Sequence, residues 1–275
     1  MRRWFSLAAL VVALGGLTAR PAHALNALEL LKNGDFELGN LFAWRRSIEP
    51  GSFGGWVLDT PGTDLPGGIF ANQFYTAANT LPGGGGDHYA AVTPPTGSEG
   101  FPGAYALYQY FTVPHGFVDR VTLRFQMFVA DYAGFGPIVS PSAPPDELFS
   151  FFDPFDPNQF GRVDLLNVDA APFSTAATDV RRNLYIGTEF SSSVSDPAPY
   201  IQYTIDITNF VSPGGRYMLR FAQVQSVSVL AMGVDNVSVI SNGQANSPEP
   251  SVIALFLSGA VGGGFLLRRR RMPRL

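Results

Sequence analysis

The side chains in this sequence with the clearest potential for catalysis are a group of carboxylates. These carboxylates lie between residues 146 and 164, where two prolines, Pro154 and Pro157, indicate an irregular loop. A glycoside hydrolase needs two carboxyl groups facing each other across the scissile bond, one of them with a raised pKa. Nothing in the linear sequence pairs two of these acids, so we expect none of them to be catalytic. We expect the phenylalanines between them to fold back on the core or to contact a partner. The acids are Asp146, Glu147, Asp153, Asp156 and Asp164, interleaved with Phe149, Phe151, Phe152 and Phe155.

The sequence offers little for nucleophilic or thiolate chemistry. It contains no cysteine, which excludes a disulfide framework, a thiolate zinc site and a cysteine nucleophile. His88 and His115 each stand near turn residues, without an acid and a nucleophile close by. A Ser-His-Asp triad is therefore not indicated.

Three aromatic residues are candidates for a sugar-binding surface. Trp44, Trp56 and Tyr75 could together form a platform on which sugar rings stack. The alternative is that they belong to the core, as most aromatic side chains of a β-sandwich do.

Short strands must position all of these side chains. Residues 176–184 alone favour a helix, and clusters of glycine and proline such as 82–86 and 137–145 punctuate the chain. The pattern predicts one all-β sandwich over residues 25–241 rather than an alternating βα fold. Apolar and polar residues alternate with the period of half-buried strands in 88–93, 104–113, 121–129, 162–168, 201–207, 217–222 and 234–240.

The two edges of this predicted domain carry a resemblance. Asn33-Gly34-Asp35-Phe36-Glu37 is followed by Trp44, and Asp235-Asn236-Val237 lies in the last predicted strand. An opening and a closing of this kind resemble jelly-roll domains of the carbohydrate-binding-module and galactose-binding-like type. The resemblance covers most of residues 26–240 and implies a sandwich of jelly-roll type.

The same resemblance implies a structural calcium ion. In that family the opening and closing strands lie side by side and often share Ca²⁺, which prefers carboxylate and carbonyl oxygens. Carried over to this chain, Glu37 and Asp235 are the first candidate ligands, and Asp35 and Asn33 the next. The alternative is that Asn-Gly-Asp only makes a turn and Asp235 caps the end of a strand.

The first 24 residues have the order of a removable export signal. Arg2 and Arg3 precede an apolar run from Trp4 to Leu17, and Ala22-His23-Ala24 supplies small residues at the expected cleavage site. The run is short for a membrane span. We therefore expect a signal peptide over residues 1–24, with cleavage after Ala24.

The C-terminal residues resemble the PEP-CTERM sorting signal. Pro248, Glu249 and Pro250 end a polar linker over 242–250, residues 251–267 carry no charge, and Arg268, Arg269, Arg270 and Arg271 follow. We expect 251–267 to be a transmembrane helix and 268–275 a basic cytoplasmic tail. The resemblance implies an exosortase-type enzyme as the partner that cleaves the tail, and an association with exopolysaccharide or matrix.

Charge divides the chain between its ends and its body. The ends hold eight of the 18 basic residues and none of the 22 acidic ones, so residues 25–250 carry about −12. An acidic body argues against nucleic acid as a partner. The hypothesis is a non-enzymatic, exported cell-envelope or matrix protein that binds polysaccharide, anchored in the inner membrane before its tail is processed. The alternatives are an extracellular glycan hydrolase and a purely structural surface protein.

Overall fold

Alternating apolar residues build two antiparallel sheets in the computed structural model. The sheet-A path runs β3-β4-β11-β6-β9, with β1 pairing with β11, and the sheet-B path runs β2-β5-β10-β7-β8. The structure describes residues 26–60, 86–93, 102–115, 118–131, 149, 151, 158–187, 200–226 and 230–243. The strands are β1 (Asn26–Glu29), β2 (Arg45–Ile48), β3 (Gly55–Asp59), β4 (Tyr89–Thr93), β5 (Gly103–Val113), β6 (Val118–Asp131), β7 (Phe160–Asn167), β8 (Val180–Gly187), β9 (Ile201–Asp206), β10 (Gly215–Gln225) and β11 (Leu230–Gly243).

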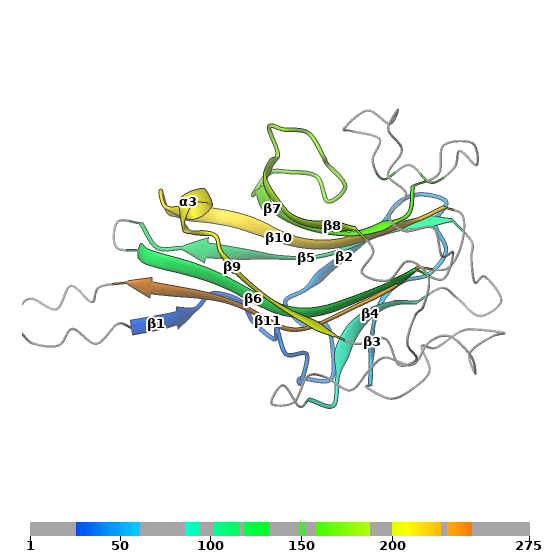
Figure 1. Ribbon diagram of the computed structural model, residues 1–275, viewed down its shortest axis with the longest axis horizontal. Helices are drawn as coiled ribbons and strands as arrows, with labels where there is room; N and C mark the ends of the chain where they lie inside the picture. Colours follow the sequence, from blue (N-terminus) through cyan, green and yellow to red (C-terminus); the bar gives the residue numbers. More distant parts are fainter. Residues whose placement is uncertain are drawn as a thin grey trace, which may run out of the picture. The chain divides into compact units, whose positions relative to one another are not determined.

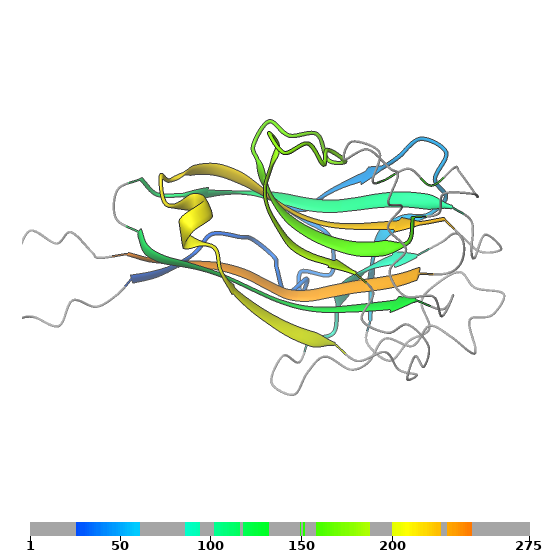
Figure 2. The ribbon, with the colours of Figure 1, turned by 45° about the horizontal axis from the view of Figure 1, so that its top comes forward.

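The two sheets lie face to face as the layers of a β-sandwich (Figures 1 and 2). The chain crosses repeatedly between the layers: β4 lies in sheet A, β5 in sheet B and β6 in sheet A again, whereas the neighbours β3 and β4, and β7 and β8, share a sheet. Apolar side chains at every second position fill the space between the layers, as the two-residue period of a strand requires. On β5 these inward residues are Tyr105, Leu107, Phe111 and Val113, and β6 supplies Val121, Leu123, Phe125, Met127 and Val129.

The outer face of sheet B carries a second apolar cluster. Ala104 and Ala106 of β5, with Met218 and Ala222 of β10, lie there under the side chains of neighbouring loops. Phe149 and Phe151 are 4% and 3% exposed in this cluster, so these two phenylalanines fold back on the domain as one sequence alternative held. Asp146, Glu147, Asp153 and Asp156 lie outside the described residues.

All seven predicted strand windows overlap a strand of the structure. The helix predicted over 176–184 is wrong, because a turn at 177–179 leads into β8, which pairs with β7. The one described helix is instead the four-residue α3 (Thr208–Val211) between β9 and β10. None of the described helices has the length and apolarity to cross a membrane. The predicted signal peptide 1–24, the sorting residues 248–250, the span 251–267 and the tail 268–275 lie outside the described residues.

Candidate functional site

Residues 30–44 form a tight hook between β1 and β2. Asn33 and Phe36 adopt left-handed backbone conformations, with φ of +51° and +59°. The Asn33 amide holds the hook closed, because its Nδ2 donates to the carbonyls of Asn40 (2.8 Å) and Phe42 (3.3 Å) and its Oδ1 accepts the Leu38 N–H (3.3 Å). Asparagine tolerates this conformation better than most residues, and the buried Phe36 side chain anchors the hook in the core.

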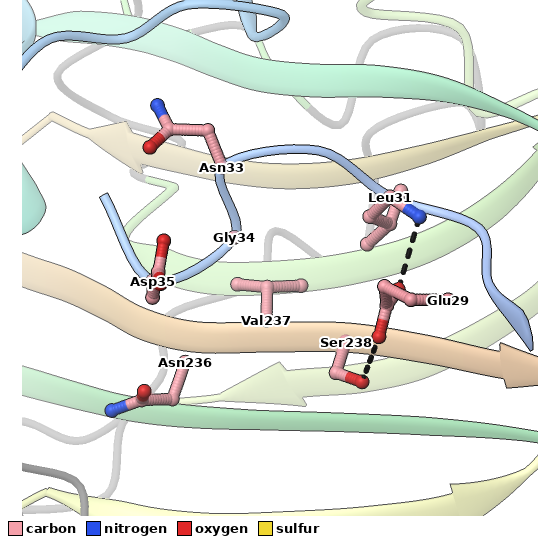
Figure 3. Close-up of a pocket in the computed structure, with 8 residues that line it drawn as sticks. All are labelled: Glu29, Leu31, Asn33, Gly34, Asp35, Asn236, Val237 and Ser238. Atoms are coloured by element: carbon pink, nitrogen blue, oxygen red, sulfur yellow. Dashed lines mark hydrogen bonds between the residues drawn. The ribbon is translucent and has the colours of Figure 1, made fainter. Parts of the chain in front are cut away.

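The hook lies against a bulge in β11 (Figure 3). The pairing of β11 with β6 shifts between Asp235 and Ser238, and Asn236 has a φ of +51°. The bulge leaves the Val237 N–H free of the ladder, and it donates to the Gly34 carbonyl at 2.8 Å. The opening and closing sequence signatures therefore form one seam between the two ends of the domain.

Gly34 is required at this seam, and its replacement gives a first prediction. A Cβ at Gly34 would lie 1.8 Å from the carbonyl oxygen of Val237, a backbone atom that cannot rotate away. We expect Gly34→Ala to destabilise the protein by roughly 1–3 kcal/mol or more in urea denaturation. Gly39→Ala is the control, since its Cβ would lie 4.0 Å from His88 Nε2, an ordinary contact, and only its φ of +67° is strained. Equal losses for the two variants would contradict the close approach.

Asp235 is a buried carboxylate at the start of the bulge. Its side chain is 1% exposed, and its Oδ1 accepts the Asn236 N–H at 2.6 Å while Oδ2 accepts the Asn236 Nδ2 at 3.0 Å. Burial raises the pKa of Asp235 to about 7, against the lowering effect of the Asn236 N–H, and the charges of Glu37 and Asp35 raise the pKa further. Asp235 therefore titrates near neutral pH.

Buried tyrosines and a second acid extend this acidic region. The Tyr89 hydroxyl donates to Asp59 Oδ2 at 3.2 Å, and both residues are buried. Tyr200 packs edge-on against Tyr89, with ring centroids 6.0 Å apart. Burial raises the pKa of Tyr200, and the charges of Tyr89, Asp235 and Asp59 act in the same direction. Burial also raises the pKa of Tyr89, so both tyrosines keep their protons through the physiological range.

Glu37, the other leading calcium candidate, has partners of its own. Its Oε1 accepts the His88 N–H at 3.0 Å, and its Oε2 lies 3.7 Å from His88 Nδ1. The carboxylate rests on Gly86, where a Cβ would come within 2.0 Å of Oε1. Glu37 therefore ties the hook to the residues that precede β4.

The four predicted calcium ligands do not converge as a group. No three acidic or histidine side chains among the described residues are placed to hold a metal ion, and the Asn33 amide is used within the hook. Residues 32–35 form a bend, whereas Asp235 lies inside β11 rather than at the end of a strand. A calcium ion here stays a prediction. A melting temperature that rises with calcium in the wild type and not in Asp235→Ala would support it. Equal melting temperatures in calcium and in chelator would remove it.

A pocket of about 280 Å³ opens beside the seam. Glu29 spans it, accepting the N–H groups of Leu31 (3.0 Å) and Val239 (2.9 Å) and the Ser238 hydroxyl (Figure 3). Within the described ranges, the exposed Asp35 carboxylate accepts one hydrogen bond, from the Glu37 N–H at 3.5 Å. The pocket combines polar groups with aliphatic surface, and its lining is Glu29, Leu31, Asn33, Gly34, Asp35, Asn236, Val237 and Ser238.

Glu29 was missed by the sequence reasoning. Its side-chain partners Ser238 and Val239 are 209 and 210 residues away in the chain. A single carboxylate in a four-residue strand carries no local pattern that predicts such partners. Only the pairing of β1 with β11 brings them together.

The two tryptophans of the predicted stacking platform lie in the core. Trp44 is 6% exposed, packs against Phe36 and Phe221, and donates its Nε1–H to the Asn33 carbonyl at 2.9 Å. Trp56 is 1% exposed. The core alternative therefore holds for both, and neither presents a ring face to a ligand. Tyr75 lies outside the described residues.

Asp164, one of the acids considered for hydrolysis, belongs to a buried charge network on sheet B. Its Oδ2 accepts from Arg220 Nη2 at 2.6 Å and from Arg162 Nε at 2.7 Å, and its Oδ1 accepts from Asn183 Nδ2 at 2.9 Å. Arg220 Nη1 also donates to the carbonyls of Pro172 and Ser174, both at 2.8 Å. Burial lowers the pKa of Arg220 and the adjacent Asp164 raises it. This acid is therefore structural.

Comparisons with known proteins identify only distant likenesses. No protein-family model and no curated protein matches the chain. Among solved structures, TmCBM61 in complex with beta-1,4-galactotriose aligns at 11% identity and a TM-score of 0.40, over 77% of this chain and 97% of the other. The K1 cleaved adhesin domain of Lys-gingipain from Porphyromonas gingivalis W83 aligns at 14% identity and 0.42, over 79% and 99%. The Stig cyclase Fisc from Fischerella sp. TAU aligns at 15% and 0.34, over 79% and 99%.

Proposed function

We propose that this chain is an exported envelope or matrix protein whose β-sandwich binds polysaccharide without hydrolysing it. The observation that carries the proposal is the pocket beside the seam. Leu31 and Val237, which are 6% and 4% exposed, line it, and Asp35 gives it an exposed carboxylate that accepts one hydrogen bond from the described residues. A sugar ring presents both C–H faces and hydroxyl donors, and such a mixed lining matches both. At about 280 Å³ the pocket is suited to a single ring rather than to a long segment.

Delivery belongs to the same proposal. The signal peptide over 1–24 and the PEP-CTERM tail would export the chain and present it to an exosortase-type enzyme. The alternation of strands between the sheets and the pairing of β1 with β11 support a jelly-roll type of sandwich. That topology places the two ends of the domain together, next to the pocket.

Retention on immobilised neutral polysaccharides tests the binding function. The full-length chain, purified in a non-ionic detergent, is passed over insoluble and exported glycans while released reducing sugar is measured. We expect retention without sugar release, weakened about tenfold in Asp35→Ala because one charge-assisted hydrogen bond is lost. Asp119→Ala, at an exposed acid of β6 outside the pocket, is the matched control.

The other outcomes decide between the alternatives. Release of sugar would contradict a binding protein and favour the glycan hydrolase. Absence of both retention and release would favour a purely structural surface protein.

A further inference from the structure

Two arginines flank one tyrosine on the outer face of sheet B. The Arg45 guanidinium carbon lies 5.2 Å from the centroid of the Tyr110 ring, and that of Arg216 lies 4.7 Å from the same centroid. Arg45 comes from β2 and Arg216 from β10, the two strands on either side of β5, which carries Tyr110. We name these three residues the arginine–tyrosine patch.

The strand registers place the patch at the border of the second apolar cluster, against which Tyr110 packs. Tyr110 pairs with Met218, and Arg216 pairs with Thr112. Further along β5, Ala104 and Ala106 are covered by the cluster that contains Phe149 and Phe151. At the patch both arginines and Thr112 are exposed, and Tyr110 is half-buried. A ligand can therefore reach the patch without any movement of the core.

No carboxylate among the described residues neutralises the charge of the patch. Neither arginine side chain has a hydrogen bond or a carboxylate partner in the part of the chain that the structure describes. On this face Asp164 pairs with arginine, and it is shared by Arg162 and Arg220. Two like charges are thus held on one ring in a body that carries about −12 overall.

Tyr110 fixes how the two cations are presented. Guanidinium groups stack on aromatic faces, and stacking holds the planar fork while leaving its N–H donors free. Tyr108 packs edge-on against Tyr110, with centroids 5.8 Å apart, which restrains the ring. Each fork can bind one carboxylate through two parallel hydrogen bonds.

We infer that the arginine–tyrosine patch binds carboxylate groups of an acidic, uronic-acid polysaccharide. The inference rests on the proposed polysaccharide-binding function and adds to it a second contact surface and a class of glycan. Two exposed forks on an open sheet face suit carboxylates repeated along a polymer. Because the contacts are exposed, binding weakens as salt rises.

Binding to polygalacturonate tests the patch, with a neutral polysaccharide that the wild type retains as the internal reference. We expect the full-length Arg45→Gln/Arg216→Gln variant to lose affinity for polygalacturonate about tenfold or more, with the neutral glycan bound as in the wild type. Tyr110→Phe keeps the ring and the affinity, whereas Tyr110→Leu loses several-fold because the forks are no longer held.

A matched pair of substitutions controls for net charge. Arg124→Gln/Arg182→Gln removes two arginines from other strands and should leave polygalacturonate binding unchanged. Equal losses in both double variants would overturn the inference, and so would tighter binding of DNA than of polygalacturonate. Wild-type retention of neutral glycan alone would overturn the inference and leave the proposed function standing. Retention of neither glycan would overturn both.

Discussion

Asp164→Ala should cost the folded protein about 3–5 kcal/mol, the largest loss expected of any single substitution here. Asp164 and Arg220 are 0% exposed, and Arg162 is nearly as buried. Removing the carboxylate leaves two buried guanidinium groups without a counter-charge. The desolvation cost of those groups is then uncompensated, which is why breaking a buried pair costs more than the pair itself contributes.

The arginines of this network should respond unequally. Arg162→Met leaves Asp164 paired with Arg220 and should cost less than Asp164→Ala. Arg220→Met also frees the carbonyls of Pro172 and Ser174, so its loss should lie between the other two. Urea denaturation of the three variants gives this order.

A surface ion pair supplies the control for this prediction. Arg120 Nε lies 3.2 Å from Asp206 Oδ2, and the two side chains are 58% and 50% exposed. Arg120→Ala should change the free energy of unfolding by less than about 1 kcal/mol. If Asp164→Ala also lost less than about 1 kcal/mol, the buried network would contribute no more than a surface ion pair.

The sandwich was predictable because strand periodicity is a local property. Val121 to Met127 and Ile201 to Ile207 alternate strictly, and both windows lie in or adjoin strands of sheet A. The 176–184 window was misassigned because Arg181 and Arg182 suit a helix as well as an edge strand. Pairing with β7, a tertiary effect, decides the outcome.

The site was predictable only in part. The resemblance at Asn33 to Glu37 and at Asp235 predicts that the opening and closing segments lie side by side. In the structure the Val237 N–H donates to the Gly34 carbonyl and joins them. The bulge at Asn236 was not foreseen, because nothing in the linear sequence marks a shift in the register between β11 and β6. The patch at Tyr110 depends on three strands brought together by the sheet, and therefore has no signature within any one of them.

Asp235→Asn should stabilise the protein at pH 8 in the presence of chelator, by roughly 1–3 kcal/mol. The pKa of Asp235 is raised from 3.8 to about 7 in the folded protein, first by burial. At pH 8 the buried carboxylate is ionised, which costs free energy that asparagine does not incur. Asparagine keeps the Oδ1 acceptor for the Asn236 N–H and loses the second bond, to Asn236 Nδ2.

The pH dependence has a definite sign. Between pH 3.8 and about 7 the folded protein holds a proton on Asp235 that the unfolded chain has released. Its contribution to stability therefore falls as pH rises through this window and levels off above it. Urea denaturation from pH 5 to 8.5 should show that decline in the wild type and a flatter profile in Asp235→Asn.

Asp206→Asn is the control for the pH profile, because its shift has the opposite direction. Hydrogen bonds from the hydroxyl and N–H of Thr208 lower the pKa of the Asp206 carboxyl. The contribution of Asp206 to the free energy of unfolding is fully present above pH 3.8 and is lost only as the pH falls further. Asp206→Asn should therefore leave the shape of the profile between pH 5 and 8.5 unchanged. Parallel profiles for the wild type and Asp235→Asn would show that another group causes the decline.

Calcium added at pH 8 separates the two roles open to Asp235. A cation bound by this carboxylate would favour its ionised form and offset the cost of burial, so the wild type would become more stable than Asp235→Asn. If the carboxylate instead only caps the bulge, calcium leaves the order unchanged and the asparagine variant stays the more stable protein. The order of the two unfolding free energies in calcium thus decides whether the seam is held by a metal ion or by hydrogen bonds alone.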